Sequence, residues 1–234
     1  KPAYERLIAA VQSQQAVAPK EDGVWRFPDG DAFYASRLRD FTTTNLTPEA
    51  IHQAGLANVA RLHEEMRAVM AELGEEGELS AFLDQVRNDD SLRYDNTEAG
   101  RSAYLDAART AIDKMAERLP DYFGLLPQSD LIVKRVEAYR EQSAGKAFYQ
   151  SPPPDGSRPG IYYANLYDMN SMPTTDLEAL AFHEGLPGHH LQLSIAAELG
   201  DVPDFQRHTR FTAFSEGWVL YSEYLAREMG FYQE

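Results

Sequence analysis

The chain has 234 residues, a hydrophobic fraction of 43% and no cysteine, which allows a folded core and excludes disulfides, thiol nucleophiles and cysteine-bound zinc. Its formal net charge of -15 argues against nucleic-acid binding, because an acidic surface repels phosphate backbones. No apolar run approaches the roughly 20 residues that span a bilayer, so we expect no membrane span.

Residues 1–128 have the periodicity of a helical protein. Apolar residues recur there at spacings of three and four, which is typical of helices that bury one face. Helices are expected over residues 4–11, 31–41, 47–73, 79–86 and 98–119. The best-defined start is Thr47-Pro48, because Thr can cap a helix and Pro suits its first position. Residues 23–27 are expected to form a short extended piece.

A small sheet is predicted within residues 129–234. Strands are expected over residues 131–139, 146–150 and 160–164, which are rich in β-branched and aromatic side chains. The proline-rich segment before the last strand can only form a loop. We therefore expect a mainly α-helical fold with a small antiparallel β-sheet, in a single domain over residues 1–234 that is a piece of a longer protein.

Helices return after the sheet. Thr175 and Glu178 have the spacing of a capping box, which predicts a helix that starts there and runs into the histidines that follow. Gly200 and Pro203 are expected to end that helix. A last helix is expected over residues 205–229.

A histidine cluster is the strongest chemical signal in the chain. Residues 183–192 read His-Glu-Gly-Leu-Pro-Gly-His-His-Leu-Gln and hold three of the six histidines. Hydrolytic zinc sites use three protein ligands and leave one position for water. Their usual helical motif, His-Glu-x-x-His, puts two histidines one turn apart and uses the Glu as base. Here Pro187 stands four residues after His183, and a straight helix would turn His189 to another face.

Pro187 and Gly188 offer a way to bring the histidines together. Pro removes a helical hydrogen bond, and Gly tolerates unusual backbone angles, so a bulge or widened turn is expected to absorb two extra residues. His189 then becomes the second ligand, while His190 remains the alternative.

The third ligand is expected on the next helix. Glu216 can reach back to the metal from an antiparallel helix, and Gly217 would allow the two helices to lie close together. Glu223 lies seven residues later on a similar face, and it is the competing candidate.

The histidine motif and the segment Phe-Ser-Glu-Gly-Trp at 214–218 resemble the bacterial family catalogued as domain of unknown function 885. Residues 23–30 and 42–52 also resemble that family, so the likeness covers nearly the whole chain. The family is similar to the gluzincin peptidases and is longer than this chain at both ends. Carboxypeptidase Taq and angiotensin-converting enzyme have Gly-His at the second ligand, which matches Gly188-His189.

This resemblance implies a gluzincin-like zincin metallopeptidase core that binds Zn²⁺ through His183, His189 and Glu216. Glu184 would be the general base, which takes a proton from water as that water attacks a peptide or small amide substrate. The alternatives are a metal-dependent hydrolase of a non-peptide amide or ester, and a non-catalytic metal- or peptide-binding protein that keeps the fold. The family also implies an exported bacterial protein.

The resemblance further assigns residues around the cleft. Residues 160–165 would be the edge strand on which a peptide lies, with Tyr162 or Tyr163 facing the cleft. His190 would support a ligand or contact the substrate.

Overall fold

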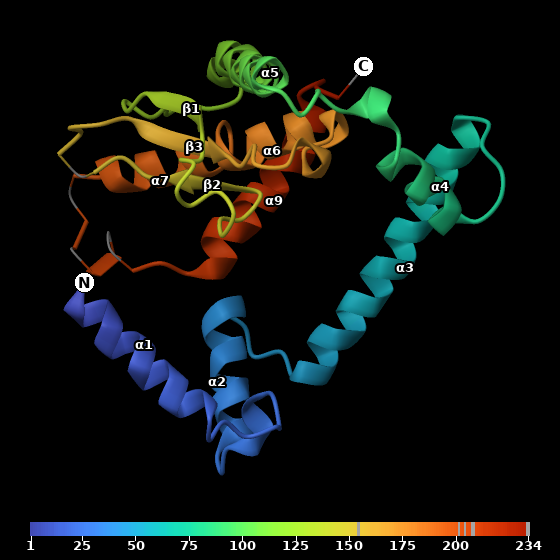
Figure 1. Cartoon of the computed structure of the whole chain (residues 1–234). Coiled ribbons are helices and arrows are strands. Elements are labelled where there is room, and N and C mark those ends of the chain that lie inside the picture. Colours follow the sequence, from blue (N-terminus) through green and yellow to red (C-terminus); the bar gives the residue numbers. More distant parts are fainter. Residues whose placement is uncertain (154, 201, 204, 207–208, 233–234) are drawn as a thin grey trace. The chain divides into compact units, whose positions relative to one another are not determined.

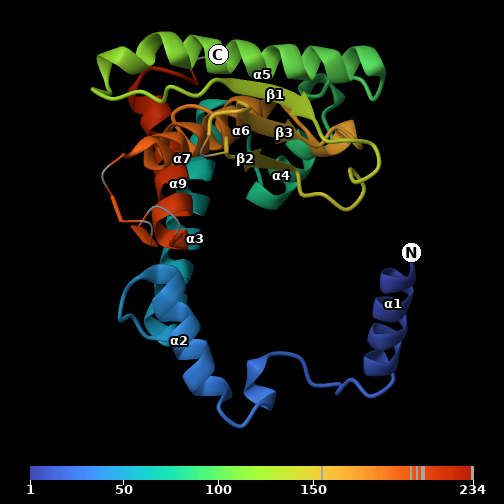
Figure 2. The same cartoon turned by 90° about the vertical axis from the view of Figure 1, so that its left-hand side faces the viewer.

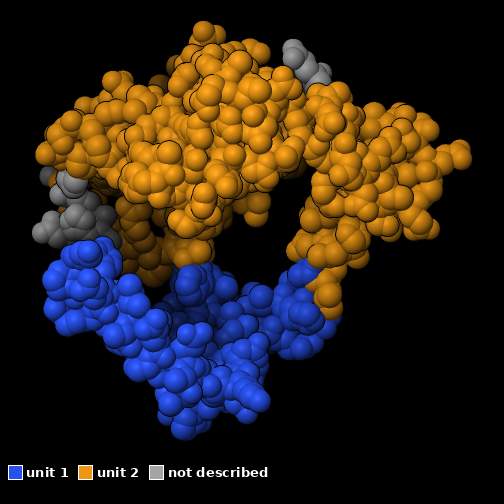
Figure 3. All heavy atoms as spheres, in the orientation of Figure 1, with its two compact units in different colours: residues 1–55 blue, residues 56–234 orange. Residues whose placement is uncertain are grey.

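The computed structural model describes residues 1–153, 155–200, 202–203, 205–206 and 209–232. The chain divides into two compact units, residues 1–55 and 56–234 (Figure 3). The single-domain organisation expected from the sequence stays a prediction. All of the candidate site residues lie in the second unit.

The first unit consists of helices α1 (Pro2–Gln15) and α2 (Gly30–Thr42) and the beginning of α3 (Pro48–Glu72). The expected cap is confirmed, because the Thr47 hydroxyl accepts a hydrogen bond from the Ala50 amide at 3.1 Å. The extended piece expected at residues 23–27 is wrong. Val24–Arg26 form a 3-10 turn instead, because Gly30 folds back so closely that a Cβ there would lie 2.1 Å from the Val24 carbonyl oxygen.

The second unit contains the rest of α3, the short helix α4 (Leu79–Arg87) and the long helix α5 (Glu98–Arg118). Thr97 caps α5 by accepting a hydrogen bond from the Gly100 amide at 3.2 Å. One face of α5 enters the core at helical spacing, through Tyr104, Ala108, Ala111, Ile112 and Met115. This packing places α5 along the sheet and against the helix that carries the first histidine (Figures 1 and 2).

The sheet contains β1 (Leu131–Arg135), β2 (Ala147–Gln150) and β3 (Gly160–Ala164) in the order β1-β3-β2. β3 pairs with β1 in parallel and with β2 antiparallel, so the expected antiparallel sheet is wrong and the sheet is mixed (Figure 1). After β1 the chain forms β2 at the opposite edge of the sheet, and it then returns to place β3 between the two. Side-chain periodicity does not reveal this crossover. β3 is consequently buried along its whole length, whereas β2 is an edge.

Three helices follow the sheet, namely α6 (Leu177–Glu184), α7 (His189–Glu198) and α9 (Thr212–Glu228). The capping box predicted from Thr175 and Glu178 is wrong. A 3-10 turn occupies 174–176, and α6 begins one residue later with no side-chain cap. The single helix expected up to residue 200 is two helices with a sharp break between them. Of the helix expected over residues 205–229, residues 205–206 are helical, residues 209–211 are not, and α9 covers the rest from Thr212, while residues 207 and 208 lie outside the described part.

Among the described residues, no helix is both long and apolar enough to cross a membrane, as expected.

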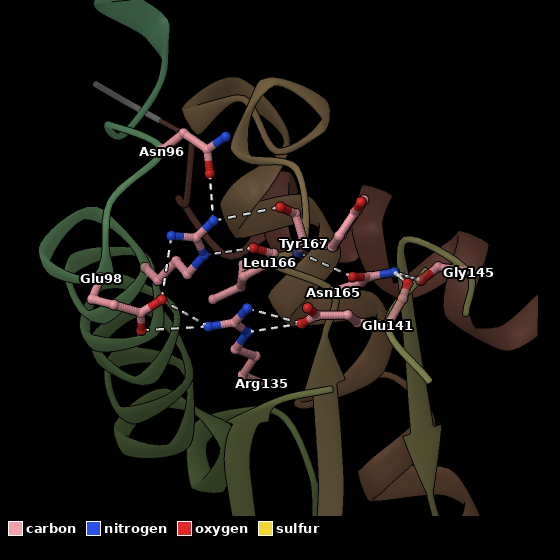
Figure 4. A network of polar contacts seen from close by, with 9 residues as sticks. Asn96, Glu98, Arg135, Glu141, Gly145, Asn165, Leu166 and Tyr167 are labelled. Carbon is pink, nitrogen blue, oxygen red and sulfur yellow. Dashed lines mark hydrogen bonds and ion pairs between the residues drawn. The ribbon is translucent and has the colours of Figure 1, made fainter. Parts of the chain in front are cut away.

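A polar network ties α5 to the sheet at the end of β1 (Figure 4). Arg135 donates to the buried carboxylate of Glu141 at 2.9 and 3.1 Å, and it also reaches Glu98 on α5 at 3.1 Å. Arg101 on α5 donates to the Leu166 carbonyl at 2.8 Å, just beyond β3. These bonds fix the strands relative to the helix that packs under the site.

Arg135→Ala is expected to lower the free energy of unfolding by about 3 kcal/mol, because it leaves the carboxylate of Glu141 buried without its cation. Arg61→Ala is the matched control, since Arg61 pairs with Glu65 on the surface of α3, with both side chains more than half exposed. That control should cost less than about 0.5 kcal/mol. Urea denaturation measures both values, and equal losses would contradict this account.

Candidate functional site

A break between α6 and α7 brings the two histidines together. The Gly185 amide closes the last turn of α6 by donating to the Ala181 carbonyl at 2.9 Å. The chain then turns through a cis Leu186–Pro187 peptide, and α7 begins at His189. The sequence predicted a bulge or widened turn within one helix, and this is wrong, since α6 ends at Glu184 and α7 begins at His189. The reason is that Pro187 cannot continue an α-helix through its own position.

Gly188 makes this reversal possible. A Cβ at Gly188 would lie 2.0 Å from the carbonyl oxygen of His183 and 2.2 Å from that of Phe182. The backbone of the turn therefore packs directly on the last turn of α6, which only glycine permits. His189 is thereby returned to the side of α6 on which His183 lies.

The imidazole rings of His183 and His189 lie at right angles, with centroids 5.1 Å apart. Together with Glu184 they offer ligand atoms that all lie within 4.8 Å of one another. From α9, Glu216 places one carboxylate oxygen 4.0 Å from Nε2 of His183 and the other 3.8 Å from Nε2 of His189. Two imidazoles and two carboxylates therefore converge, as the sequence predicts.

This donor set fits a zinc ion. Two ligands of a tetrahedral zinc lie about 3.4 Å apart, and two bonds of about 2.1 Å can span at most about 4.2 Å. The separations of 3.8 and 4.0 Å run from the two histidine nitrogens to different oxygens of Glu216, so this side chain would have to move inward for one oxygen to reach an ion shared with both histidines. Glu216 is half exposed, which leaves it free to make that movement.

Glu223 takes the position behind the first histidine. Nδ1 of His183 donates to a carboxylate oxygen of Glu223 at 2.8 Å, and this hydrogen bond raises the pKa of His183. Metal-binding histidines usually hold their second nitrogen in this way, with the other nitrogen turned to the metal. The geometry thus separates the two candidates: Glu216 faces Nε2, and Glu223 orients the ring.

Glu184 has the environment of a base. Its side chain is buried, and this burial raises its pKa from 4.5 to about 7, to which the charges of Glu216 and Glu223 add. A carboxylate with a pKa near neutrality can both accept and return a proton at physiological pH. Burial lowers the pKa of His189 and so favours the neutral imidazole that a metal ligand requires.

His190 points away from the ligands into the interior. It is 2% exposed, and its Nε2 lies 2.9 Å from the Ser129 carbonyl, so this nitrogen carries the proton and donates. Its Nδ1 accordingly accepts, and the Tyr149 hydroxyl lies 3.0 Å from it. With both nitrogens engaged, His190 is a poor metal ligand, and it supports the wall of the site through Tyr149.

The two tyrosines expected to face the cleft do not line it. Tyr162 is fully buried in the central strand, and Tyr163 stacks on Phe148 at 4.7 Å with Lys134 over its ring. The expectation that β3 is the edge strand is wrong, because β1 and β2 flank it. The sequence signal of a central strand is a continuous apolar run, in place of the alternation of apolar and polar residues that a half-exposed strand shows.

A cavity of about 420 Å³ opens at the ligands. Its wall includes His183, Glu184, His189 and Glu216, together with most of the edge strand β2. The remaining lining residues are Ser151, Leu193, Arg210 and Ser215. The volume is within the range of small-molecule sites, so a short peptide segment can enter beside the histidines.

α9 also holds the turn itself. The Trp218 indole donates to the Pro187 carbonyl at 2.9 Å, and the Ser222 hydroxyl lies 3.4 Å from the same oxygen. Sequence reasoning missed both residues, although their four-residue spacing next to Glu216 was a usable signal. Gly217 was wrongly assigned, because a Cβ there would meet nothing within 4 Å.

Comparison with known proteins identifies the family. A family model described as a bacterial protein of unknown function, DUF885, matches residues 1–234. The chain belongs to this family. No curated protein matches it.

Two solved structures are similar to this DUF885 chain. A candidate lipoprotein from Colwellia psychrerythraea matches with a TM-score of 0.95 and 31% identity, over 99% of this chain and 40% of that one. A candidate lipoprotein of unknown function from Shewanella oneidensis matches with a TM-score of 0.69 and 16% identity, over 97% of this chain and 42% of that one. The second match concerns the fold alone. The chain thus spans less than half the length of either protein.

Gly188→Ala is expected to lower the free energy of unfolding by about 3 kcal/mol, because the new methyl group would overlap two backbone carbonyls that cannot move aside. Gly217→Ala is the matched control in α9, where the methyl group meets open space and should stabilise the helix by up to about 1 kcal/mol. Thermal and urea unfolding report both, and equal tolerance at the two positions would refute the close contact at Gly188.

In metal-free protein, Glu184 should make stability depend on pH. Its folded-state pKa of about 7 exceeds the unfolded value of 4.5, so the folded state binds the proton more tightly and loses stability as pH rises through this interval. The difference corresponds to about 3 kcal/mol. With a chelator present, Glu184→Gln should therefore unfold at higher urea than the parent at pH 8, and the gap should close towards pH 4.5.

Glu64→Gln, at an exposed carboxylate on α3, is the control and should change the free energy of unfolding by less than about 0.5 kcal/mol. A gap between Glu184→Gln and the parent that stays constant with pH would mean that burial does not perturb Glu184.

Proposed function

We propose that this protein is a zinc-dependent hydrolase of peptide or amide bonds, with a gluzincin-like arrangement of ligands. One observation carries the proposal. Nε2 of His183 lies 4.0 Å from one oxygen of Glu216 and Nε2 of His189 lies 3.8 Å from the other, with the buried carboxylate of Glu184 beside the two histidines. Two histidines, a carboxylate and an adjacent base form the donor set of hydrolytic zinc sites.

The ligand residues would hold a zinc ion from three helices. His183 comes from the end of α6, His189 from the start of α7, and Glu216 from α9, so the site depends on packing of all three. A bound zinc ion would supply a Lewis acid that lowers the pKa of water and polarises a substrate carbonyl. Glu223 keeps the first histidine ring oriented by accepting from Nδ1.

Glu184 moves the proton in this proposal. As the oxygen of water forms a bond to the carbonyl carbon, Glu184 accepts a proton from that water. As the carbon–nitrogen bond breaks, Glu184 returns the proton to the departing amine. The buried position of Glu184 beside the two histidines keeps the accepted proton available for this second transfer.

The edge strand β2 offers a docking line for an extended substrate. Its outer edge has no partner strand in the described sheet, and Ala147, Phe148 and Tyr149 line the cavity that contains the histidines. A peptide can hydrogen bond to such an edge through its backbone, irrespective of its side chains. This favours a peptide over a non-peptide amide or ester.

The setting we propose is an exported bacterial protein. The support is that the similar Colwellia structure is described as a candidate lipoprotein, which is a class of exported proteins. The longer relatives leave room for further substrate-binding segments, so the substrate range of a full-length protein belongs to this proposal as well.

Elemental analysis of the purified chain tests the metal site. We expect about one zinc per chain in the parent and in Glu184→Gln, loss of zinc in His183→Ala and His189→Ala, and roughly 10–100-fold weaker binding in Glu223→Gln. His63→Ala, on the surface of α3, is the histidine control. Hydrolysis of a peptide panel should disappear in Glu184→Gln although zinc is retained.

Three outcomes would count against parts of the proposal. A parent chain that takes up no zinc after reconstitution would end it. Cleavage of esters without cleavage of peptides would replace the substrate class. Tight zinc binding with no turnover, in this chain and in a full-length relative, would make the protein a metal-binding module.

A further inference from the structure

A second, smaller cavity adjoins the candidate metal site. Its volume is about 170 Å³, and it shares Ser151, Leu193, Arg210 and Ser215 with the larger cavity. The shared walls mean that the two cavities are neighbouring parts of one depression. A single substrate residue can therefore place its backbone in one and its side chain in the other.

The smaller cavity is built for an apolar group. Pro152, Phe211 and Phe214 line it, and the two phenylalanines are 50% and 59% exposed. Large aromatic side chains exposed around a hollow are typical of ligand contacts. The Phe214 backbone is fixed from behind, because Gln192 donates to its carbonyl at 2.8 Å.

Arg210 stands between the two cavities. It is the only lysine or arginine among the described residues that line either of them, and it has no ion-pair partner in the described part of the chain. In a chain with a net charge of -15, a cation beside a cavity that has no ion-pair partner among the described residues marks a place for an anion.

We propose that Arg210 binds the free carboxylate of a C-terminal peptide residue whose apolar side chain occupies the smaller cavity. The inference deepens the proposed function and rests on it. A guanidinium group matches a carboxylate with two parallel hydrogen bonds, which a neutral amide end cannot accept in the same way. The amide bond before that residue then lies in the larger cavity, beside the histidines and Glu184.

Cleavage at that bond is balanced by water alone. The water oxygen joins the carbonyl carbon, the bond to the nitrogen of the terminal residue breaks, and a proton passes through Glu184 to that nitrogen. The products are a shortened peptide with a new carboxylate and one free apolar amino acid. No oxidant, reductant or further reactant is required.

Binding to the zinc-loaded Glu184→Gln chain tests the inference without turnover. The probes are acetyl-alanyl-phenylalanine and its C-terminal amide, measured by isothermal titration calorimetry. We expect the acid to bind about tenfold more tightly than the amide, because of the charge-assisted pair with Arg210. Arg210→Gln should reduce acid binding to the level of the amide and leave amide binding unchanged, and Arg210→Lys should keep part of the difference.

Arg227→Gln, at an exposed arginine on α9 outside both cavities, is the matched control and should keep the full preference. Acetyl-alanyl-glycine should bind more weakly than the phenylalanine peptide, since it leaves the smaller cavity empty. Equal binding of acid and amide, no binding of either, or a preference that survives in Arg210→Gln would each overturn the inference.

Zinc analysis of the same samples separates this inference from the proposed function. If zinc is bound and the acid is not preferred, only the role of Arg210 fails. If the chain binds no zinc and still prefers the acid, Arg210 anchors carboxylates and the metal-dependent reaction fails.

Discussion

A close approach of two backbone segments governs this site. Gly188 lies against the carbonyls of His183 and Phe182, and only this contact lets α7 start where His189 meets His183. α9 secures the same turn through the hydrogen bond from Trp218 to Pro187. The helix that offers Glu216 thus also locks the turn that presents the histidines, so assembly of the donor set and packing of the three helices are one event.

This arrangement of charges is electrostatically unfavourable. Three carboxylates surround two histidines, and one of them, Glu184, is held in a place that disfavours its charge. A fold without function would fill such a place with an apolar side chain. A cation bound as proposed would relieve this strain, because a positive charge between the ligands would stabilise every neighbouring carboxylate. An electrostatic cost of this kind is typical of functional sites, where stability is often given up for activity.

Local signals in the sequence predicted the helices well, because spacing, caps and prolines act within a few residues, as at Thr47 and α3. They also brought His183, Glu184, His189 and Glu216 together. What failed depends on distant contacts. The parallel pairing of β1 with β3 follows from a chain crossover. Gly188 is needed because backbone carbonyls lie against it, whereas Gly217 faces open space, and the sequence around each glycine does not reveal this difference. The hydroxyl of Tyr149 and the carbonyl of Ser129, which hydrogen bond to the buried ring of His190, belong to residues 41 and 61 positions away in the chain.

The orientation of His190 has a consequence for the opposite wall of the cavity. Since its Nε2 is occupied as a donor, its Nδ1 draws the hydroxyl of Tyr149 inward, and Ser194 lies 3.3 Å from the same hydroxyl. The ring of Tyr149, which stacks on that of His189, therefore lines the cavity, while its hydroxyl proton is donated to a hydrogen bond in the interior. A tetrahedral oxyanion forming there would find no phenol to stabilise it at this wall. In the proposed reaction, the donor for that negative charge would therefore be a group other than Tyr149.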